Sequence, residues 1–74
     1  MITRVTAHIT GTVWKVDVKV GDAVAEGQPV VTIESMKMEM PVDSPAAGRV
    51  RAILVQEGQS VQEGATLLEL SPPG

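Results

Sequence analysis

The segment Glu34–Met40 holds the most distinctive grouping of functional side chains in the sequence. It reads Glu-Ser-Met-Lys-Met-Glu-Met, so Lys37 supplies an amine and three of the chain's four methionines surround it. A lysine in a turn is usually a solvated charge, and Met36, Met38 and Met40, spaced two apart, fit the buried face of a strand. That interpretation is favoured for Met40. Exposed thioethers at Met36 and Met38 would instead offer a soft contact surface beside the amine.

No other grouping has the make-up of a catalytic or metal site. His8 is the only histidine, cysteine is absent, and Asp22 and Asp43 lack a nucleophile–base pair at a useful spacing. Neither a catalytic triad nor a metal cluster can therefore be assembled, and we expect no catalytic and no metal-binding residue. We place His8 in a turn or at the surface. Trp14, the only aromatic residue, can pack against the fold or contact a partner, and packing is favoured.

Composition narrows the classes of function. With 74 residues the chain (1–74) has room for a single small domain with a thin core, and we expect a monomer in isolation. A net charge of −3 disfavours nucleic acid and anionic membranes as partners. The absence of cysteine fits a reducing cytoplasm, and the short apolar stretches predict neither a targeting signal nor a membrane segment.

The elements that position Lys37 can be inferred from an internal repeat. At an offset of 37 residues, Gly11–Ile33 aligns with Gly48–Leu70 without a gap, and seven of the 23 pairs are identical. Glycines bound the segments Gly21–Gly27 and Gly58–Gly64, where tight turns need positive φ. Each unit is predicted to be a strand, a turn and a strand, and the two units to pack through an approximate twofold axis as a flattened barrel or sandwich.

Strand is favoured over helix throughout both units. No segment of about twelve residues keeps a helical apolar stripe, and the best helical candidate, Val50–Glu57, has a strongly β-branched repeat partner in Val13–Val20. The predicted strands carry Val13, Val16 and Val18 in the first unit and Val50, Ile53 and Val55 in the second.

The link between the units must reverse the chain near residues 35–38, between strands expected at Val30–Ile33 and Met40–Val42. Two-residue hairpin turns need positive φ and favour Asn-Gly, Asp-Gly or Gly-X, but the segment contains no such pair. Because strain is often tolerated where a residue has another purpose, we interpret the surroundings of Lys37 as a candidate functional site.

The segment Glu34–Glu39 resembles the attachment motif of biotinyl domains, in which the lysine of Met-Lys-Met takes the biotin. The resemblance runs nearly the whole length of the chain, from Val5 to Leu70, in the segments Gly11–Val16, Gly21-Asp22, Gly27-Gln28 and Ser44–Val50. It implies an all-β fold, a flattened eight-stranded barrel of two four-stranded antiparallel sheets with quasi-twofold symmetry. Such a fold would present Lys37 on a tight hairpin far from both termini.

The resemblance also implies a function, that of a biotin carboxyl carrier. A biotin protein ligase would attach biotin covalently to Lys37, with Met36 and Met38 shaping recognition of the tip and Glu34 and Glu39 adding acidic contacts. A biotin carboxylase would load a carboxyl group, and a carboxyltransferase would pass it to an acceptor, as in an acyl-CoA carboxylase such as acetyl-CoA carboxylase. The carrier itself would not be catalytic.

The chain departs from the family's usual pattern in three ways. His8 and Thr10 stand where many relatives have proline, which affects only the first turn, and the path from Gly11 to Gly21 leaves no space for the protruding thumb of some bacterial carriers. An Ala/Pro-rich tether is missing and Met1 comes first, which favours a stand-alone carrier over an excised domain.

Two alternatives remain open beside the biotin carrier. A lipoyl domain shares the fold, but usually has an acidic residue before the modified lysine, where this chain has Met36. An unmodified interaction module, as in transporter adaptors, would make Lys37 incidental. Those adaptors usually interrupt the motif with a long helical hairpin, whereas the motif here is continuous.

Overall fold

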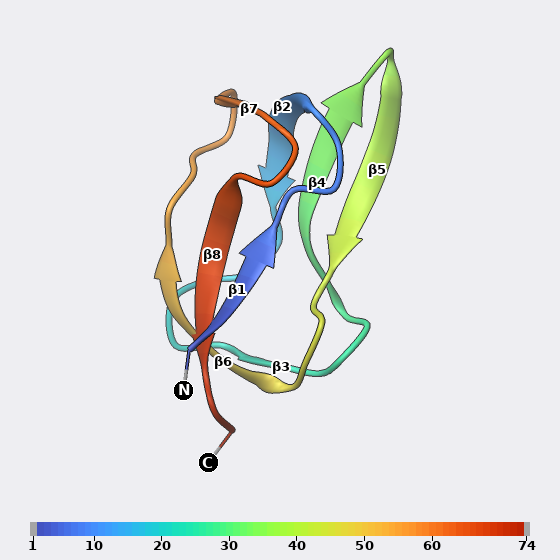
Figure 1. The fold of residues 1–74 in the computed structure, drawn as a ribbon. Coiled ribbons are helices and arrows are strands. Elements are labelled where there is room, and N and C mark those ends of the chain that lie inside the picture. The colour runs from blue at the N-terminus through green and yellow to red at the C-terminus, as the bar shows by residue number, and fades with distance from the viewer. Residues whose placement is uncertain (1, 74) are drawn as a thin grey trace.

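The computed structural model describes residues 2–73, in which all helical or extended structure is β-strand. The eight strands are β1 (Thr3–Thr6), β2 (Gly11–Val16), β3 (Ala23–Val24), β4 (Pro29–Ser35), β5 (Met38–Asp43), β6 (Gly48–Ile53), β7 (Ser60–Val61) and β8 (Thr66–Ser71). They form two four-stranded antiparallel sheets, ordered β1-β8-β6-β3 and β5-β4-β2-β7 (Figure 1). The predicted fold class is therefore confirmed. Over the same residues there is no helix long and apolar enough to span a membrane.

The sequence repeat relates one sheet to the other strand by strand. An offset of 37 residues carries β2 onto β6, β3 onto β7, β4 onto β8 and β1 onto β5, so each sheet order maps onto the other. The register follows the same rule, because the pair Thr32↔Pro41 corresponds to the pair Glu69↔Arg4. Both copies also have a β-bulge at the same place, after Val13 in β2 and after Val50 in β6. The expected quasi-twofold symmetry is thus present down to single residues.

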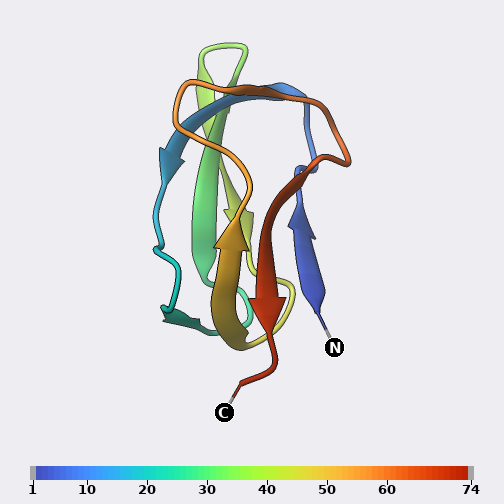
Figure 2. The ribbon, with the colours of Figure 1, turned by 90° about the vertical axis from the view of Figure 1, so that its left-hand side faces the viewer.

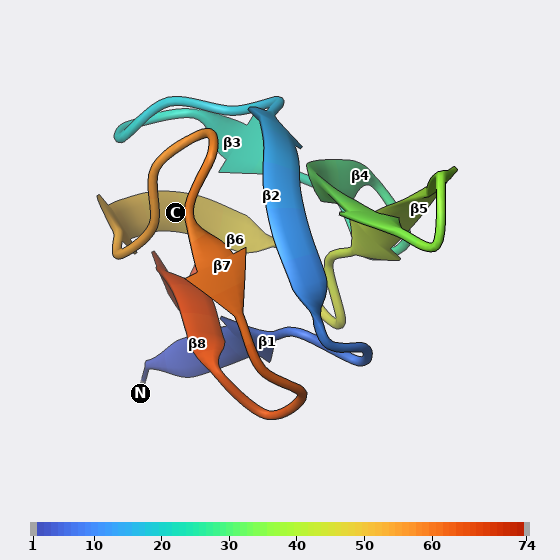
Figure 3. The same ribbon diagram turned by 90° about the horizontal axis from the view of Figure 1, so that it is seen from above.

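Each half of the chain completes the sheet of the other half. β3, from the first half, pairs with β6, and β7, from the second half, pairs with β2, as the view from above shows (Figure 3). The flanking loops repeat the exchange: the Gly21 N–H donates to the Val50 carbonyl at 2.8 Å and the Gly58 N–H to the Val13 carbonyl at 2.7 Å. Because of this exchange, neither half can open without breaking the other's sheet.

The core is built almost entirely from valine, leucine and isoleucine. Its buried apolar residues fall into pairs 37 positions apart: Val5/Val42, Val13/Val50, Val18/Val55, Val24/Val61, Val30/Leu67, Val31/Leu68 and Ile33/Leu70, with Ala7 as the counterpart of the buried Ser44. The Ser44 hydroxyl donates to the Ala46 carbonyl at 2.6 Å, so its burial leaves no polar atom unsatisfied.

Two sequence expectations need adjustment. The strands were expected to include Val18 and Val55, but β2 ends at Val16 and β6 at Ile53. Both valines are still buried, because the chain leaves the sheet to enter the glycine turns while continuing to cover the core. The helical alternative for Val50–Glu57 is wrong, since its first residues belong to β6 and pair with β8.

The molecule is elongated, with principal extents of 38 × 18 × 18 Å. The β4–β5 turn lies at one end of the long axis and both termini lie at the other (Figures 1 and 2). The predicted separation between the turn and the termini is therefore observed.

Candidate functional site

The β4–β5 hairpin turns on only two residues, Met36 and Lys37, because Ser35 pairs with Met38. Their φ angles are 52° and 65°, and they are the two non-glycine residues with positive φ within residues 2–73. Two successive positive φ angles are the geometry of a tight hairpin turn, normally filled by Asn-Gly. An L-residue other than glycine costs roughly 1–2 kcal/mol in this conformation. The prediction of a strained turn at this place is confirmed.

The strain is sustained by the strands below it. The β4–β5 pairing extends from Pro29↔Asp43 up to the turn, and Val31, Ile33 and Val42 anchor it in the core at 0–4% exposure. A turn held by strands this firmly rooted is over-determined, which is the condition under which unfavourable φ angles persist. The hairpin thus places the turn rigidly beyond the body of the molecule.

The free edge of β5 is protected beside the turn. In a two-residue hairpin the pair closing the turn is hydrogen-bonded and the pairs alternate from there, so Thr32↔Pro41 is a non-hydrogen-bonded pair. The backbone nitrogen of Pro41 therefore faces away from β4, toward the open edge. Proline at this place costs no hydrogen bond within the sheet and removes a donor that another strand could use.

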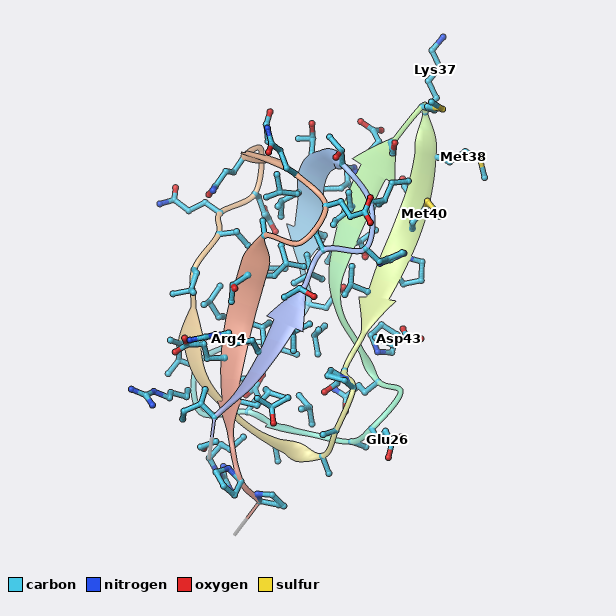
Figure 4. All side chains as sticks on the ribbon, viewed as in Figure 1. Arg4, Glu26, Lys37, Met38, Met40 and Asp43 are labelled. Atoms are coloured by element: carbon cyan, nitrogen blue, oxygen red, sulfur yellow. The ribbon has the colours of Figure 1, made fainter. Side chains whose placement is uncertain are left out.

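Lys37 points away from the body at the far end of the hairpin (Figure 4). The salt bridges found in residues 2–73 join Lys15 to Asp17 and Arg51 to Glu69, and no hydrogen bond there engages the Lys37 amine. The amine is therefore accessible to an acylating agent. A group joined to it would stand clear of the chain, which fits a long prosthetic group carried on a covalent arm.

The three methionines of the segment Glu34–Met40 differ in their exposure to solvent. Met36, in the turn, is 93% exposed and Met38 is 64% exposed, so the buried-strand interpretation is wrong for both. Met40, opposite Ile33, is half-buried, as was favoured for it. Two thioethers therefore flank the amine in solvent, where they form a soft apolar surface.

Two carboxylates lie just below the turn. Glu34 on β4 and Glu39 on β5 pair directly across the hairpin and both are exposed. Like charges at directly opposed positions disfavour pairing, so their juxtaposition adds to the cost already incurred at the turn. The structure thus brings together all of the predicted site residues: Glu34, Met36, Lys37, Met38 and Glu39.

The other polar candidates lie elsewhere and serve local structure. His8 is exposed in the loop after β1, as predicted, and the Asp22 carboxylate accepts the Lys19 N–H at 2.8 Å within a turn. No group of three or more His, Asp or Glu side chains in the part of the chain that the structure describes is placed to hold a metal ion, and no pocket is found there. Trp14 is 49% exposed and outside the core, contrary to the packing role favoured for it.

One supporting residue was missed by sequence reasoning. A Cβ atom on Gly11 would lie 2.5 Å from the Glu34 carbonyl oxygen, so β2 approaches β4 closely just below the turn. Gly48 makes the same approach to Ser71 in the other sheet. The identity of Gly11 and Gly48 in the repeat was the available signal, but a glycine that starts a strand is easily taken for an ordinary boundary residue.

Comparisons with known proteins agree with this geometry. A biotin/lipoyl family model described as "Biotin-requiring enzyme" matches residues 2–70. The chain is 46% identical over 67 residues to a biotin/lipoyl attachment protein of Bacillus subtilis, covering 90% of this chain and 92% of that protein. It is 48% identical over 66 residues to the biotin carboxyl carrier protein of acetyl-CoA carboxylase of Solanum lycopersicum, covering 89% and 94%. The Kluyveromyces lactis urea carboxylase structure matches with a TM-score of 0.91 and 34% identity, covering 96% of this chain and 6% of that one.

Proposed function

The chain belongs to the biotin/lipoyl attachment family, and from this premise we propose that it is a biotin carboxyl carrier whose Lys37 bears biotin through an amide bond. The observation that carries the proposal is the turn itself. A lysine in a left-handed conformation stands exposed at the end of a hairpin anchored in the core, with no ion-pair partner among residues 2–73. Such strain has no structural benefit, whereas it presents the amine to an enzyme.

The residues of the chain supply position rather than catalysis. The amine and not the ammonium is the nucleophile in acylation. Within residues 2–73 no ion pair or hydrogen bond joins Lys37 to a base, so the biotin protein ligase would take up the proton. Acylation removes the positive charge of Lys37 and leaves Glu34 and Glu39 as the charges of the tip. The ureido nitrogen of bound biotin would supply the site that accepts and releases a carboxyl group.

The elongated shape suits transfer between two enzymes. With Lys37 at one end of a 38 Å molecule, the arm is carried away from both termini, through which a carrier can be anchored. Tethering raises the effective concentration of the carried group at a biotin carboxylase and at a carboxyltransferase without a diffusive encounter for each transfer. An acyl-CoA, such as acetyl-CoA, is the proposed acceptor, supported by the name of the tomato relative.

Lipoylation is the second candidate, since the Bacillus subtilis relative is named for both groups. Lipoyl domains resemble this chain in fold but usually have an acidic residue before the lysine. Here that position is Met36, whose side chain is 93% exposed and so fully available to a ligase. A methionine and not an acidic residue at this exposed position favours biotin over lipoate.

The test is intact-mass measurement after incubation with a biotin protein ligase, biotin and ATP, followed by peptide mapping over residues 34–49 and over the segment that contains Lys15 and Lys19. We expect one biotinyl increment on Lys37 and none in Lys37→Arg, with the melting temperature of the variant preserved. Lys19→Arg, at another exposed lysine, is the matched control and should be modified like the wild type. Biotin on Lys15 or Lys19 in the Lys37→Arg variant would refute the assignment, and a lipoyl increment with the organism's own ligases would replace it.

A further inference from the structure

The symmetry of the fold allows its two outer faces to be compared residue by residue. On the sheet of β1, β8 and β6, the central outward row is Arg4, Glu69 and Ala52. The bulge residue Arg51 lies beside this row, with its Nε 3.9 Å from a Glu69 carboxylate oxygen. This outer face therefore has three charged side chains, those of Arg4, Glu69 and Arg51.

The corresponding row on the other sheet is uncharged at two of its three positions. It consists of Pro41, Thr32 and Lys15, and its bulge residue is Trp14. Val13 is buried, whereas Trp14 and Lys15 are both exposed, so the bulge turns two successive side chains outward. The only aromatic residue of the chain thus stands 49% exposed where its counterpart is an arginine.

Trp14, half-exposed at the bulge of β2, is available to a binding partner. The side chain is large and apolar, and it lies outside the core cluster of residues 2–73. Tryptophan is the residue type most enriched among those that dominate the energy of protein interfaces, where a pocket desolvates the ring. We propose that the outer face of β2, β4 and β5, centred on Trp14, is the surface on which the biotin protein ligase docks. This proposal rests on the proposed attachment of biotin to Lys37.

Continuity with the hairpin connects this face to Lys37. β4 and β5 run directly from the turn into the face, and Trp14 follows Val13, the partner of Ile33. Lys37 lies four positions after Ile33, which is about 13 Å along a strand that rises roughly 3.3 Å per residue. An enzyme that covers the turn and a surface of ordinary interface size would also cover Trp14.

The ligase is the partner whose chemistry requires this contact. Its activated biotin carbonyl must come within bonding distance of the Lys37 amine, so it must seat the turn itself. A carboxylase meets the distal end of the biotin arm and has less need of the strands. Glu34 and Glu39 border the face on the side of the turn, so the complementary ligase surface combines an apolar pocket for the indole with basic groups for these carboxylates.

The experiment compares biotinylation kinetics of the full chain with the same ligase. For Trp14→Ala we expect kcat/KM to fall by about tenfold, through a higher KM with kcat unchanged, because docking and not chemistry is weakened. Trp14→Phe should recover most of the loss. Arg51→Ala, the matched change on the opposite face, should stay within about twofold of the wild type, and thermal melting should show all three variants folded.

The outcomes separate the two proposals. A kcat/KM for Trp14→Ala within about twofold of the wild type, or an equal loss in Arg51→Ala, would overturn the docking face while leaving biotin on Lys37. Normal biotinylation of Trp14→Ala combined with a loss only in carboxyl transfer would also overturn it, by assigning the face to a carboxylase. If the wild-type chain takes up no biotin, the proposed function itself is refuted, and the docking face with it.

Discussion

The β4–β5 hairpin and its symmetry counterpart, the β8–β1 pair, have the same register but differ in how their strands end. Ile33↔Met40 in one corresponds to Leu70↔Thr3 in the other. The first pair of strands is closed by a two-residue turn at the far end of the molecule, and the second ends in the two termini (Figure 1). Identical scaffolds therefore support a chain reversal at one end and the chain's ends at the other.

This difference teaches where function lies in a duplicated fold. The positions that keep their residue type between the halves, such as Val13 and Val50 or Gly11 and Gly48, serve the core and the close approach of neighbouring strands. The exposed features that suggest chemistry or docking are found where the halves differ. Trp14, for example, is paired with Arg51, and the turn has no counterpart at all.

The largest expected effect tests this contrast between shared and differing positions at Gly11 and Gly48. An added Cβ would lie 2.5 Å from a carbonyl oxygen at each position, that of Glu34 for Gly11 and that of Ser71 for Gly48. Because the obstacle is backbone, strands must shift, and we expect each alanine variant to lose about 1–3 kcal/mol of unfolding free energy in urea denaturation.

The two variants should differ in modification, not in the order of magnitude of their stability loss. Gly11→Ala displaces the strand beside Glu34, three residues from Lys37, and should slow biotinylation under conditions where both variants are folded. Gly48→Ala acts at the end with the termini and should be modified at the wild-type rate. Equal slowing in both variants would mean that global stability, and not local support of the turn, governs modification.

A change in stability of intermediate size is expected at the β4–β5 turn. Met36→Gly relieves a positive φ of 52°, and after the larger unfolded-state entropy of glycine is subtracted we expect a gain of about 0.5–1 kcal/mol. In a domain of this size that corresponds to a rise in melting temperature of roughly 2–8 °C by calorimetry.

The same variant should be a poorer ligase substrate, since it loses an exposed thioether beside Lys37. Met36→Ala is the control, because it removes the thioether and retains the unfavourable φ. A Met36→Gly variant that is no more stable than the wild type would show that the turn is unstrained. The interpretation of the turn as a stability cost accepted for function would then be wrong.

The sequence predicted most of the fold because the repeat exposes the pairing. Alignment of the halves placed the glycine turns, the strands and the reversal at residues 35–38, all of which the structure contains. Trp14 was expected to pack against the fold because a large aromatic side chain gains most from burial. With Val13 turned inward, strand alternation already faces Trp14 outward, as the structure has it. The β-bulge after Val13 adds Lys15 to the outer face, and no feature of the segment Val13–Lys15 predicts that bulge.

The candidate site was predicted as a set of residues but not as a geometry. Local rules marked Met36 and Lys37 as a poor turn, and the structure shows that they nevertheless form one, because β4 and β5 are held by the core on either side. The close approach of Gly11 to Glu34 depends on the distance between two strands, which no single segment of sequence encodes.

The smallest effects are expected on the two outer faces, each of which has one surface ion pair. Arg51 and Glu69 lie 3.9 Å apart on one face and Lys15 and Asp17 lie 3.8 Å apart on the other, with both cationic side chains more than half exposed. Pairs of this kind contribute about 0–1 kcal/mol and are screened by salt. Arg51→Gln and Lys15→Gln should therefore each change the unfolding free energy by less than about 1 kcal/mol, and by still less in 1 M NaCl. A loss of 2 kcal/mol or more in Arg51→Gln alone would make the charged face a structural element, and its contrast with the Trp14 face would then reflect stability and not docking.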